Sequence, residues 1–299
     1  MEFWHQKKVF ITGHTGFIGR HLVVKLRSFG AQVQGCEIDL LRESLAAPGC
    51  QNQDYIFHLA AKSPAATDTV NTTQLIQDNL NMTKNVLELA RMIGAKVIVA
   101  SSSHVYSPVT GKEGHPFTES EIVFGKTLSA FGISKQETEG LCRKFVQEYD
   151  IDVVVVRMSN VYGPGDTTHR FIPTFIRQCL RRKFPLEVLG NAETVRDFVY
   201  IDDVIAGLLR ASQISGPIEI INLGSGRATS LAAVADAIRN AVDLNDQPVY
   251  YSSSGEDDVS YNVLNINKAL QKIGYVPMVS LAEGIQKTVL WWQTQEKIK

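Results

Sequence analysis

The sequence has few cysteines, and none of them has the spacing of a metal or redox motif. Its four cysteines, Cys36, Cys50, Cys142 and Cys179, are scattered along 299 residues and form no CxxC pair. Paired spacing of that kind is typical of zinc sites and reactive dithiols. We therefore expect the cysteines to act as small buried hydrophobic residues in a reducing compartment, and we expect no metal site.

An excess of one charge and long hydrophobic runs are also absent. The 30 Lys and Arg residues nearly balance the 31 Asp and Glu residues, which gives a formal net charge of -1. A balanced charge gives no support to a nucleic-acid or membrane partner. No apolar run reaches the ~20 residues that a membrane-spanning helix needs. No secretory signal pattern precedes the first predicted strand, so we expect a cytoplasmic protein.

What the sequence does contain is a glycine-rich turn between a predicted strand and a predicted helix. The apolar run 9–11 is typical of a buried strand, and the apolar residues of 20–30 share one helical face. Gly13, Gly16 and Gly19 lie between them at three-residue spacing. In this context the glycines allow a tight turn, approach of a pyrophosphate and close helix packing, and the helix start attracts anions. The alternative is a glycine-rich turn without a ligand.

Predicted strands and helices then alternate along the chain, as in an α/β fold with a parallel sheet. The length of 299 residues suits one large unit or two domains that share one fold. The further predicted strands are 31–36, 54–59, 96–100, 152–157 and 218–223, and the further predicted helices include 73–93, 130–149, 171–182 and 231–242.

An acidic residue follows the second predicted strand, about 20 residues after the glycines. Glu37 lies where a carboxylate can accept the ribose hydroxyls of adenosine and would repel a 2′-phosphate, which favours NAD over NADP. The segment that follows Glu37 is short, so Asp39 and Leu40 are candidates for adenine contacts. An ordinary exposed acid is the alternative interpretation of Glu37.

Small and polar residues follow the third and fourth predicted strands. The strand 54–59 is followed by the small residues Ala60 and Ala61, which leave room for a cofactor. We interpret His58 as a structural residue. Residues 101–106 place hydroxyl groups at the carboxyl end of a parallel strand, which faces the ligand crevice. Phe131 and Lys135 are four residues apart on a predicted helix, so they share one face.

Together these segments resemble the extended short-chain dehydrogenase/reductase family, in its nucleotide-sugar epimerase/dehydratase branch. The matching segments are TGHTGFIG (12–19), HLAA (58–61), NLNMT (79–83), SSSHVY (101–106), FGISK (131–135), NVYGPG (160–165) and RDFVYIDDV (196–204). The resemblance implies an α/β Rossmann fold with a doubly wound parallel sheet and a smaller C-terminal α/β lobe. The NAD-binding domain would comprise residues 1–165 with returns near 196–225. The substrate lobe would comprise 166–195 and 226–299.

The resemblance also implies a site for NAD and a site for a nucleoside-diphosphate sugar. Ser102 would hydrogen-bond the reacting oxygen of the sugar, Lys135 would bind the nicotinamide ribose, and Phe131 completes the catalytic positions. The implied NAD contacts are Gly13, Gly16, Phe17, Ile18, Gly19, Glu37, Asp39, Leu40, Leu59, Ala60, Ala61, Asn79 and Lys135. The implied substrate contacts are Ser102, Ser103, His104, Asn160, His169 and Arg196, of which Asn160 and Arg196 would hold the diphosphate. The family further implies a homodimer through helices 73–93 and 131–149.

Three positions depart from the pattern of this family. Phe131 stands where the family has a tyrosine base, and a phenyl ring can neither take nor give a proton. Ser103 and His104 stand where dehydratases carry an Asp-Glu pair that eliminates water. Residues 253–258 contain no arginine, although the family often has a second diphosphate-binding arginine there.

The first hypothesis is an NAD-dependent epimerase, acting at C4 of a nucleoside-diphosphate sugar through a transient keto sugar, in which Phe131 replaces the tyrosine and inactivates it. A nucleotide-sugar 4,6-dehydratase or 4-keto-reductase is the alternative within the family. The second hypothesis is a native enzyme that uses His104 or His169 as its acid/base. The third is a catalytically silent protein that binds NAD or a nucleotide sugar.

Overall fold

A parallel β-sheet of six strands forms the centre of the structure. The structure is a computed structural model, and it describes residues 2–41, 52–63, 71–106, 114–121, 128–216, 218–252 and 261–296. The chain order of the strands reverses at β1, which lies between β2 and β3. In such sheets, ligands bind at the carboxyl ends of the strands beside the reversal. The strands are β1 (Lys8–Thr12), β2 (Gln32–Gly35), β3 (Tyr55–His58), β4 (Lys96–Ser102), β5 (Val153–Met158) and β10 (Ile218–Leu223), in the all-parallel order β10–β5–β4–β3–β1–β2.

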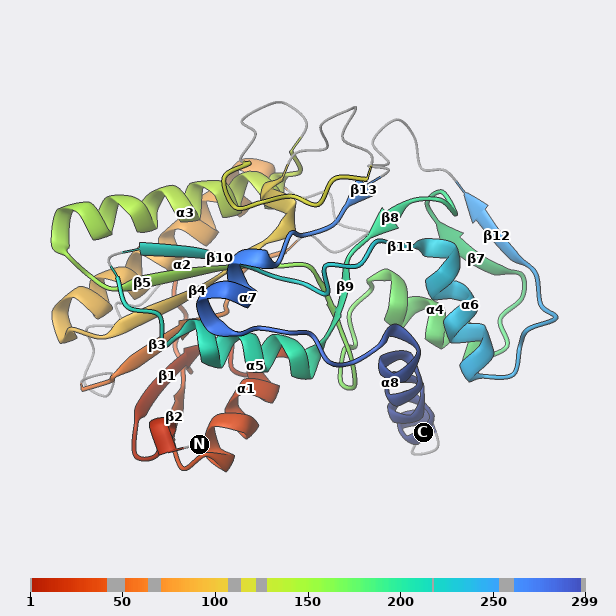
Figure 1. Ribbon diagram of the computed structural model, residues 1–299, viewed down its shortest axis with the longest axis horizontal. Helices are drawn as coiled ribbons and strands as arrows, with labels where there is room; N and C mark the ends of the chain where they lie inside the picture. The colour runs from red at the N-terminus through yellow and green to blue at the C-terminus, as the bar shows by residue number, and fades with distance from the viewer. Residues whose placement is uncertain are drawn as a thin grey trace.

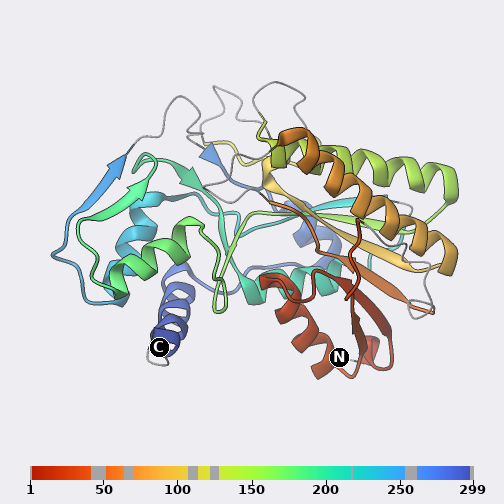
Figure 2. The same ribbon diagram turned by 180° about the vertical axis from the view of Figure 1, so that it is seen from behind.

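Helices cover both faces of the sheet (Figures 1 and 2). The helices α1 (Phe17–Ser28) and α5 (Ile201–Ala211) lie on one face, and α2 (Thr72–Ile93) and α3 (Ala130–Tyr149) lie on the other. Successive side chains of a strand point to opposite faces, so Val9 and Ile11 pack toward α1 and α5 while Phe10 packs toward α2 and α3. This arrangement confirms the predicted α/β fold.

A smaller lobe lies beside the sheet, on the right in Figure 1. The helix α7 (Asn267–Ile273) packs on α5 and β10. The lobe has α4 (Phe171–Leu180), α6 (Leu231–Ala241), α8 (Leu281–Glu296), and the paired strands β7 (Leu186–Leu189) and β12 (Val249–Ser252). Short strands complete the fold: β6 (Asn160–Tyr162) pairs with β9 (Phe198–Tyr200), and β8 (Val195–Arg196) lies between β11 (Thr229–Ser230) and β13 (Tyr261–Asn262).

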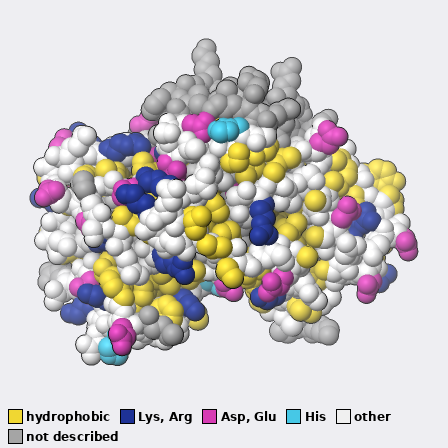
Figure 3. All heavy atoms as spheres, in the orientation of Figure 1, with side chains coloured by type: hydrophobic (Ala, Val, Ile, Leu, Met, Phe, Trp, Pro, Cys, Tyr) yellow, Lys and Arg dark blue, Asp and Glu magenta, His cyan; other side chains and the backbone are white. Residues whose placement is uncertain are grey.

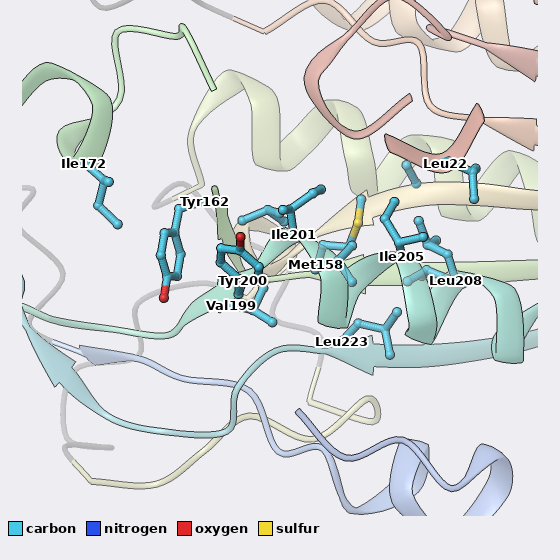
Figure 4. Packing of buried hydrophobic residues seen from close by; sticks show 14 of the residues in the cluster. Leu22, Met158, Tyr162, Ile172, Val199, Tyr200, Ile201, Ile205, Leu208 and Leu223 are labelled. Carbon is cyan, nitrogen blue, oxygen red and sulfur yellow. The ribbon is translucent and has the colours of Figure 1, made fainter. Parts of the chain in front are cut away.

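One hydrophobic cluster continues from the sheet into the smaller lobe (Figure 4). On the sheet side it contains Leu22 of α1 and Ile205 of α5, and on the lobe side it contains Ile172 of α4. Tyr162 and Tyr200 lie between these groups, with their rings edge to face and the centroids 5.7 Å apart. The two parts of the chain therefore share one core.

The fourth strand of the chain is longer than the sequence predicts. The expected strand ends at Ala100, whereas β4 continues to Ser102. Ser101 and Ser102 pair in register with Arg157 and Met158 of β5, so the ladder continues past the last apolar residue. Their hydroxyl groups are thereby held on a strand and not on a loop.

The surface carries both signs of charge. Lys and Arg side chains are interspersed with Asp and Glu side chains on the face that Figure 3 shows. Over the described ranges, no helix is both long and apolar enough to span a membrane.

The cysteines that the structure describes form no disulfide. Cys142 and Cys179 are buried, and Cys36 is half-buried. Cys50 lies outside the described residues. Among the described residues, no group of three or more His, Cys, Asp or Glu side chains is arranged to hold a metal ion.

His58 connects three elements inside the fold. Its Nδ1 lies 2.8 Å from Thr12 Oγ1 on β1, and its Nε2 lies 3.1 Å from Thr83 Oγ1 on α2. The side chain is buried, and burial together with the charge of Lys135 lowers its pKa to about 3. These contacts agree with the structural role that the sequence suggests for His58.

We predict that His58 makes the folded state less stable as the pH falls. An unfolded histidine takes up a proton near pH 6.5, whereas folded His58, with a pKa of about 3, does not. The unfolded state therefore binds more protons between these values, and the free energy of unfolding decreases as the pH falls through them. Thermal unfolding at pH 7, 6 and 5 should show a shallower decrease for His58→Gln than for the wild type.

The matched control for this prediction is His115→Gln, because the His115 ring is exposed. The control should keep the wild-type slope of melting temperature against pH. Equal slopes for His58→Gln and the wild type would contradict the assignment.

Candidate active site

The glycine-rich turn brings β1, β3 and α1 into close contact. Gly13 has a φ of +70°, and a Cβ atom there would lie 2.8 Å from the backbone nitrogen of Ala60. A Cβ atom at Gly19 would overlap the carbonyl oxygen of Gly13. Side chains at these positions would push the helix away from the strands, so the turn requires glycine at both.

The start of α1 is open to an anion. Its N-cap residue is Gly16, which supplies no side chain to cap the helix. The first N–H groups of a helix have no partners within it, and they carry the positive end of the helix dipole. Among the predicted contacts, Phe17 and Ile18 are the first two residues of α1. These features fit the pyrophosphate of a dinucleotide.

The predicted adenosine contacts in the segment after β2 differ in their exposure to solvent. Glu37 is exposed just beyond the strand. Asp39 is also exposed, and its Oδ1 accepts a hydrogen bond of 3.0 Å from the backbone of Leu41. Leu40 is buried in the core beneath α2, and its carbonyl accepts a 2.7 Å bond from Asn85 Nδ2. Glu37 and Asp39 are thus exposed at the surface, whereas the side chain of Leu40 is buried.

Asn79 fixes the segment that follows β3. Its Oδ1 accepts a 2.8 Å hydrogen bond from the backbone N–H of Lys62, and its Nδ2 donates to the Lys62 carbonyl at 3.0 Å. The same Nδ2 donates to Ser134 Oγ on α3 at 3.1 Å. Asn79 therefore joins α2, α3 and the loop that contains the predicted contacts Ala60 and Ala61.

A pocket of about 570 Å³ opens at the carboxyl ends of the strands, between the sheet and α4. It brings together predicted cofactor, catalytic and substrate positions. The predicted site residues that line it are Ile18, Leu59, Ala61, Ser102, His104, Phe131, Lys135 and Asn160. The predicted site residues outside its lining are Gly13, Gly16, Phe17, Gly19, Glu37, Asp39, Leu40, Ala60, Asn79, Ser103, His169 and Arg196.

Lys135 is held by the sheet and by Phe131. Its Nζ donates a 2.7 Å hydrogen bond to the carbonyl of Ala100 and lies 5.5 Å from the centroid of the Phe131 ring. The side chain is buried, and burial lowers the pKa of Lys135 to about 8. Phe131 and Lys135 therefore lie on one face of α3, as expected, and both line the pocket.

A buried ion pair attaches α3 to the sheet behind the pocket. Arg157 of β5 donates from Nε to Glu139 Oε1 at 2.9 Å and from Nη2 to Glu139 Oε2 at 2.7 Å. Ser101 Oγ donates to Glu139 Oε1 at 2.7 Å, and Arg157 Nη1 donates to Tyr106 Oη at 2.9 Å. Buried charges are tolerated when hydrogen bonds satisfy both partners, as they do here.

Ser102 and His104 form a hydrogen-bonded pair at the pocket wall. Ser102 caps the short 3-10 helix Ser103–Val105, and its Oγ accepts a 3.2 Å bond from the backbone N–H of His104. The same Oγ lies 2.9 Å from Nδ1 of His104. His104 lines the pocket and is exposed to solvent on one side. Partial desolvation, followed by the charges of Arg170 and Arg196, lowers its pKa to about 4. His104 is therefore neutral at pH 7, and its Nδ1 can accept the Ser102 proton.

Asp197 organises the side of the pocket that belongs to the smaller lobe. It is fully buried and accepts hydrogen bonds from Ser159 Oγ at 3.1 Å, Ser225 N at 2.7 Å and Gly226 N at 3.1 Å. Its backbone carbonyl accepts a 3.0 Å bond from Nδ2 of Asn160, which lines the pocket. The interactions of Asp197 thus set the position of Asn160 and of the neighbouring β8, which carries Arg196.

Three predicted substrate contacts, Ser103, His169 and Arg196, lie outside the pocket lining. Nη1 of Arg196 donates a 2.9 Å hydrogen bond to the carbonyl of Val195. Ser103 is buried, and its carbonyl accepts bonds from Tyr106 N and Asn262 Nδ2. His169 is exposed before α4. The segment 253–258, where the sequence lacks an arginine, lies outside the described residues.

Arg170 is a lining residue that the sequence analysis missed. It is the N-cap residue of α4, and its charge acts on His104. The sequence contains a signal for it, because Arg170 directly precedes the predicted helix 171–182 and follows His169, a predicted substrate contact. Apolar lining residues that were also missed are Met158, Phe171, Ile172 and Phe198.

Comparison with families of known proteins gives a match over most of the chain. Residues 9–224 match a family described as the NAD dependent epimerase/dehydratase family. The match includes the glycine-rich turn, Ser102, Lys135 and Asn160.

Individual relatives resemble the chain over most of its length. It is 28% identical to UDP-glucuronic acid decarboxylase 1 of Xenopus tropicalis, over 97% of this chain and 73% of that protein. It is 29% identical to UDP-glucuronate 4-epimerase of Thermodesulfobacterium geofontis (strain OPF15), over 79% of this chain and 71% of that protein. The structure of MoeE5 in complex with UDP-glucuronic acid and NAD matches with a TM-score of 0.85 and 26% identity, over 96% of this chain and 99% of that one.

We predict that Gly19→Ala abolishes binding of NAD and lowers thermal stability. The new Cβ would overlap the Gly13 carbonyl, so α1 must move from the strands and its N–H groups must leave the turn. Gly140→Ala on α3 is the control, because a Cβ there meets no atom within 4 Å and alanine favours helix by about 1 kcal/mol. Isothermal titration with NAD and thermal melts of both variants provide the measurement. Unchanged NAD affinity in Gly19→Ala would contradict the placement of the cofactor.

Proposed function

The chain belongs to the NAD dependent epimerase/dehydratase family, and we propose that it binds NAD and a nucleoside-diphosphate sugar and inverts the sugar at C4. One observation carries this proposal. A single pocket contains the hydroxyl of Ser102, the ammonium of Lys135 and the amide of Asn160, and the open start of α1 adjoins it through Ile18.

Each group in the pocket has a separate function in binding. The α1 N-terminus holds the cofactor pyrophosphate, and Lys135 holds the nicotinamide ribose. Ser102 Oγ hydrogen-bonds the reacting oxygen of the sugar, while Asn160 and Arg196 hold the diphosphate. NAD, when bound there, would supply the hydride acceptor and donor that inversion of the sugar carbon requires.

Loss of carbon dioxide from a uronic acid is the second candidate function. Oxidation at C4 of a hexuronate places a ketone β to the carboxylate, and a β-keto acid loses CO₂ readily. Arg170 at the pocket wall supplies a cation that can bind a sugar carboxylate. Its position favours a uronate as the substrate of this chain, and a UDP-glucuronic acid decarboxylase is among the relatives.

A 4,6-dehydratase is less well supported than either of these functions. Ser103 is buried with its carbonyl bonded, and His104 is neutral and paired with Ser102. Neither residue supplies a carboxylic acid for the elimination of water. A 4-keto-reductase would use the same pocket. A protein that binds NAD or a nucleotide sugar without catalysing a reaction is the alternative from another functional class.

The test of the proposed function is an assay of product formation. The protein is incubated with NAD and, separately, UDP-glucuronic acid, UDP-glucose and UDP-N-acetylglucosamine, and the products are separated by chromatography. A C4 epimer supports the first candidate, and a UDP-pentose with release of CO₂ supports the second. Binding of NAD and a UDP-sugar without turnover of any of them would support the silent-binding alternative.

We also propose that the chain forms a homodimer. The helices α2 and α3 pack side by side on one face of the sheet (Figures 1 and 2). Two such pairs can associate about a twofold axis, which is the commonest symmetry of soluble oligomers.

We predict that NAD binds more tightly than NADP. The exposed carboxylate of Glu37 accepts ribose hydroxyls and repels a 2′-phosphate. Titration of both cofactors into the wild type and Glu37→Ala measures this preference, which should narrow in the variant. Glu88→Ala on α2 is the control and should retain the preference. A tenfold preference of the wild type for NADP would contradict the prediction.

We predict that the two arginines recognise different parts of the substrate. Arg196→Ala should weaken binding of every UDP-sugar by about 1.5–3 kcal/mol, the usual contribution of a charge-assisted hydrogen bond. Arg170→Ala should weaken the binding of UDP-glucuronic acid much more than the binding of UDP-glucose. Calorimetry with both sugars measures the effects, and NAD affinity should be unchanged. Arg91→Ala in the last turn of α2 is the control. Equal losses of affinity for NAD and for UDP-sugars in the Arg170 and Arg196 variants would show that these arginines are structural.

A further inference from the structure

We propose that Ser102 and His104 form a proton relay that replaces the missing tyrosine hydroxyl at Phe131. Ser102 contacts the sugar hydroxyl, and His104 is the group that stores its proton. This inference rests on the proposed function, because it concerns the oxidation and reduction of the sugar carbon.

The hydrogen bonds around Ser102 already point in the direction that the relay needs. The backbone N–H of His104 donates to Ser102 Oγ at 3.2 Å, which leaves the hydroxyl proton to be donated elsewhere. Nδ1 of His104 lies 2.9 Å from the same oxygen and accepts that proton when the ring is neutral. The remaining lone pair of Ser102 Oγ can accept a hydrogen bond from a sugar hydroxyl in the pocket.

His104 is also held against the residue whose hydroxyl is absent. Its ring meets the Phe131 ring edge to face at 79°, with the centroids 5.8 Å apart. A Cβ atom at Gly132 would overlap the His104 carbonyl, so the start of α3 packs directly on the His104 backbone. The imidazole therefore has a fixed position within the part of the pocket where a phenol would act.

The proton step balances with the oxidation of the sugar. Oxidation at C4 would need a hydride acceptor, which NAD would supply, and the O4–H proton would pass to Ser102 Oγ. The original Ser102 proton passes to His104 Nδ1, which becomes positively charged. Return of the hydride reverses both transfers, so the serine and the histidine recover their starting states after each turnover.

Charges around the pocket couple the relay to substrate binding. Arg170 and Arg196 disfavour a second positive charge on His104, and this contributes to its low pKa of about 4 in the free protein. A diphosphate on Arg196 or a carboxylate on Arg170 would neutralise that effect. Substrate binding should therefore raise the basicity of His104 when the proton must be accepted.

The other charged groups near the relay are held by hydrogen bonds or ion pairs of their own. Lys135 donates to Ala100, and Asp197 is buried under several donors. The ion pair of Arg157 and Glu139 is buried behind the strands. Asp166 lines the pocket, and its Oδ1 accepts a hydrogen bond from Thr168 N at 3.1 Å.

The other candidates for the base fit the geometry less well. His169 is exposed and does not line the pocket. Lys135 is committed to the Ala100 carbonyl and to the cofactor ribose in the proposed function. Among the described lining residues, His104 is the one histidine.

The relay is tested with three forms of the full chain, on whichever UDP-sugar the wild type converts. His104→Gln keeps a polar side chain but cannot store a proton, so its kcat should fall about 10²- to 10⁴-fold with little change in KM. Adding Phe131→Tyr to that variant should restore most of the lost turnover, because Lys135 can stabilise the tyrosinate. His115→Gln, whose ring is exposed away from the pocket, is the control.

A second readout follows the ionisation of His104 itself. NMR of labelled imidazoles in the wild type should show the pKa of His104 rising by at least one unit when UDP-glucuronic acid binds. The kcat of the wild type should fall at low pH with a midpoint at the pKa of His104 in the substrate complex. The variant that combines His104→Gln with Phe131→Tyr should lose this dependence of kcat on pH.

Each outcome decides between the proposals. If His104→Gln keeps its kcat, or if Phe131→Tyr fails to restore turnover to it, the relay is wrong while the proposed function stands. An unchanged pKa on UDP-glucuronic acid binding would also overturn the relay. If the wild type converts no UDP-sugar, the proposed function fails and the relay fails with it.

Discussion

The ion pair between Arg157 and Glu139 is the interaction on which the pocket depends. It joins α3 to β5 through two hydrogen bonds, and Ser101 of β4 bonds to the same carboxylate. Glu139 lies one helical turn after Lys135, so the pair also sets how far Lys135 reaches toward the sheet. Removing one partner of a buried pair typically costs about 3–5 kcal/mol, because the other charge is left without compensation. The position of the pocket and the stability of the fold are therefore maintained by the same contact.

Much of the fold could be predicted from the sequence because its signals are local. The glycines at 13, 16 and 19 combine with an apolar strand and an amphipathic helix within about 20 residues. The four-residue spacing of Phe131 and Lys135 similarly follows from helix geometry, and both residues line the pocket. Local periodicity indicates which face of an element is buried, and the parallel order of the strands then brings their carboxyl ends together.

The rest of the site depends on pairings that local patterns do not report. Arg157 follows four valines and reads as an ordinary strand residue, although its partner is Glu139 on another element. Asp197 accepts hydrogen bonds from residues 28 and 67 positions later in the chain. The hydrogen bond between Ser102 and His104 is local, but its meaning depends on Phe131 and on the arginines across the pocket. Local patterns therefore predict several residues of the pocket lining, but not Arg170 and not the contacts that connect them.

The hydrophobic core that the two lobes share limits how substrates can be selected. The core that contains Tyr162, Tyr200 and Ile172 spans both lobes, so one lobe cannot move away from the other without exposing apolar surface, at about 25 cal/mol for each Å². In the proposed function, the distance between β4 and α4 would therefore limit the size of the sugar ring and its substituents. Selectivity among sugars would then come from the volume and charge of the side chains that line this space. Exchange of Met158, Phe171 or Phe198 would change it while the framework stays unchanged.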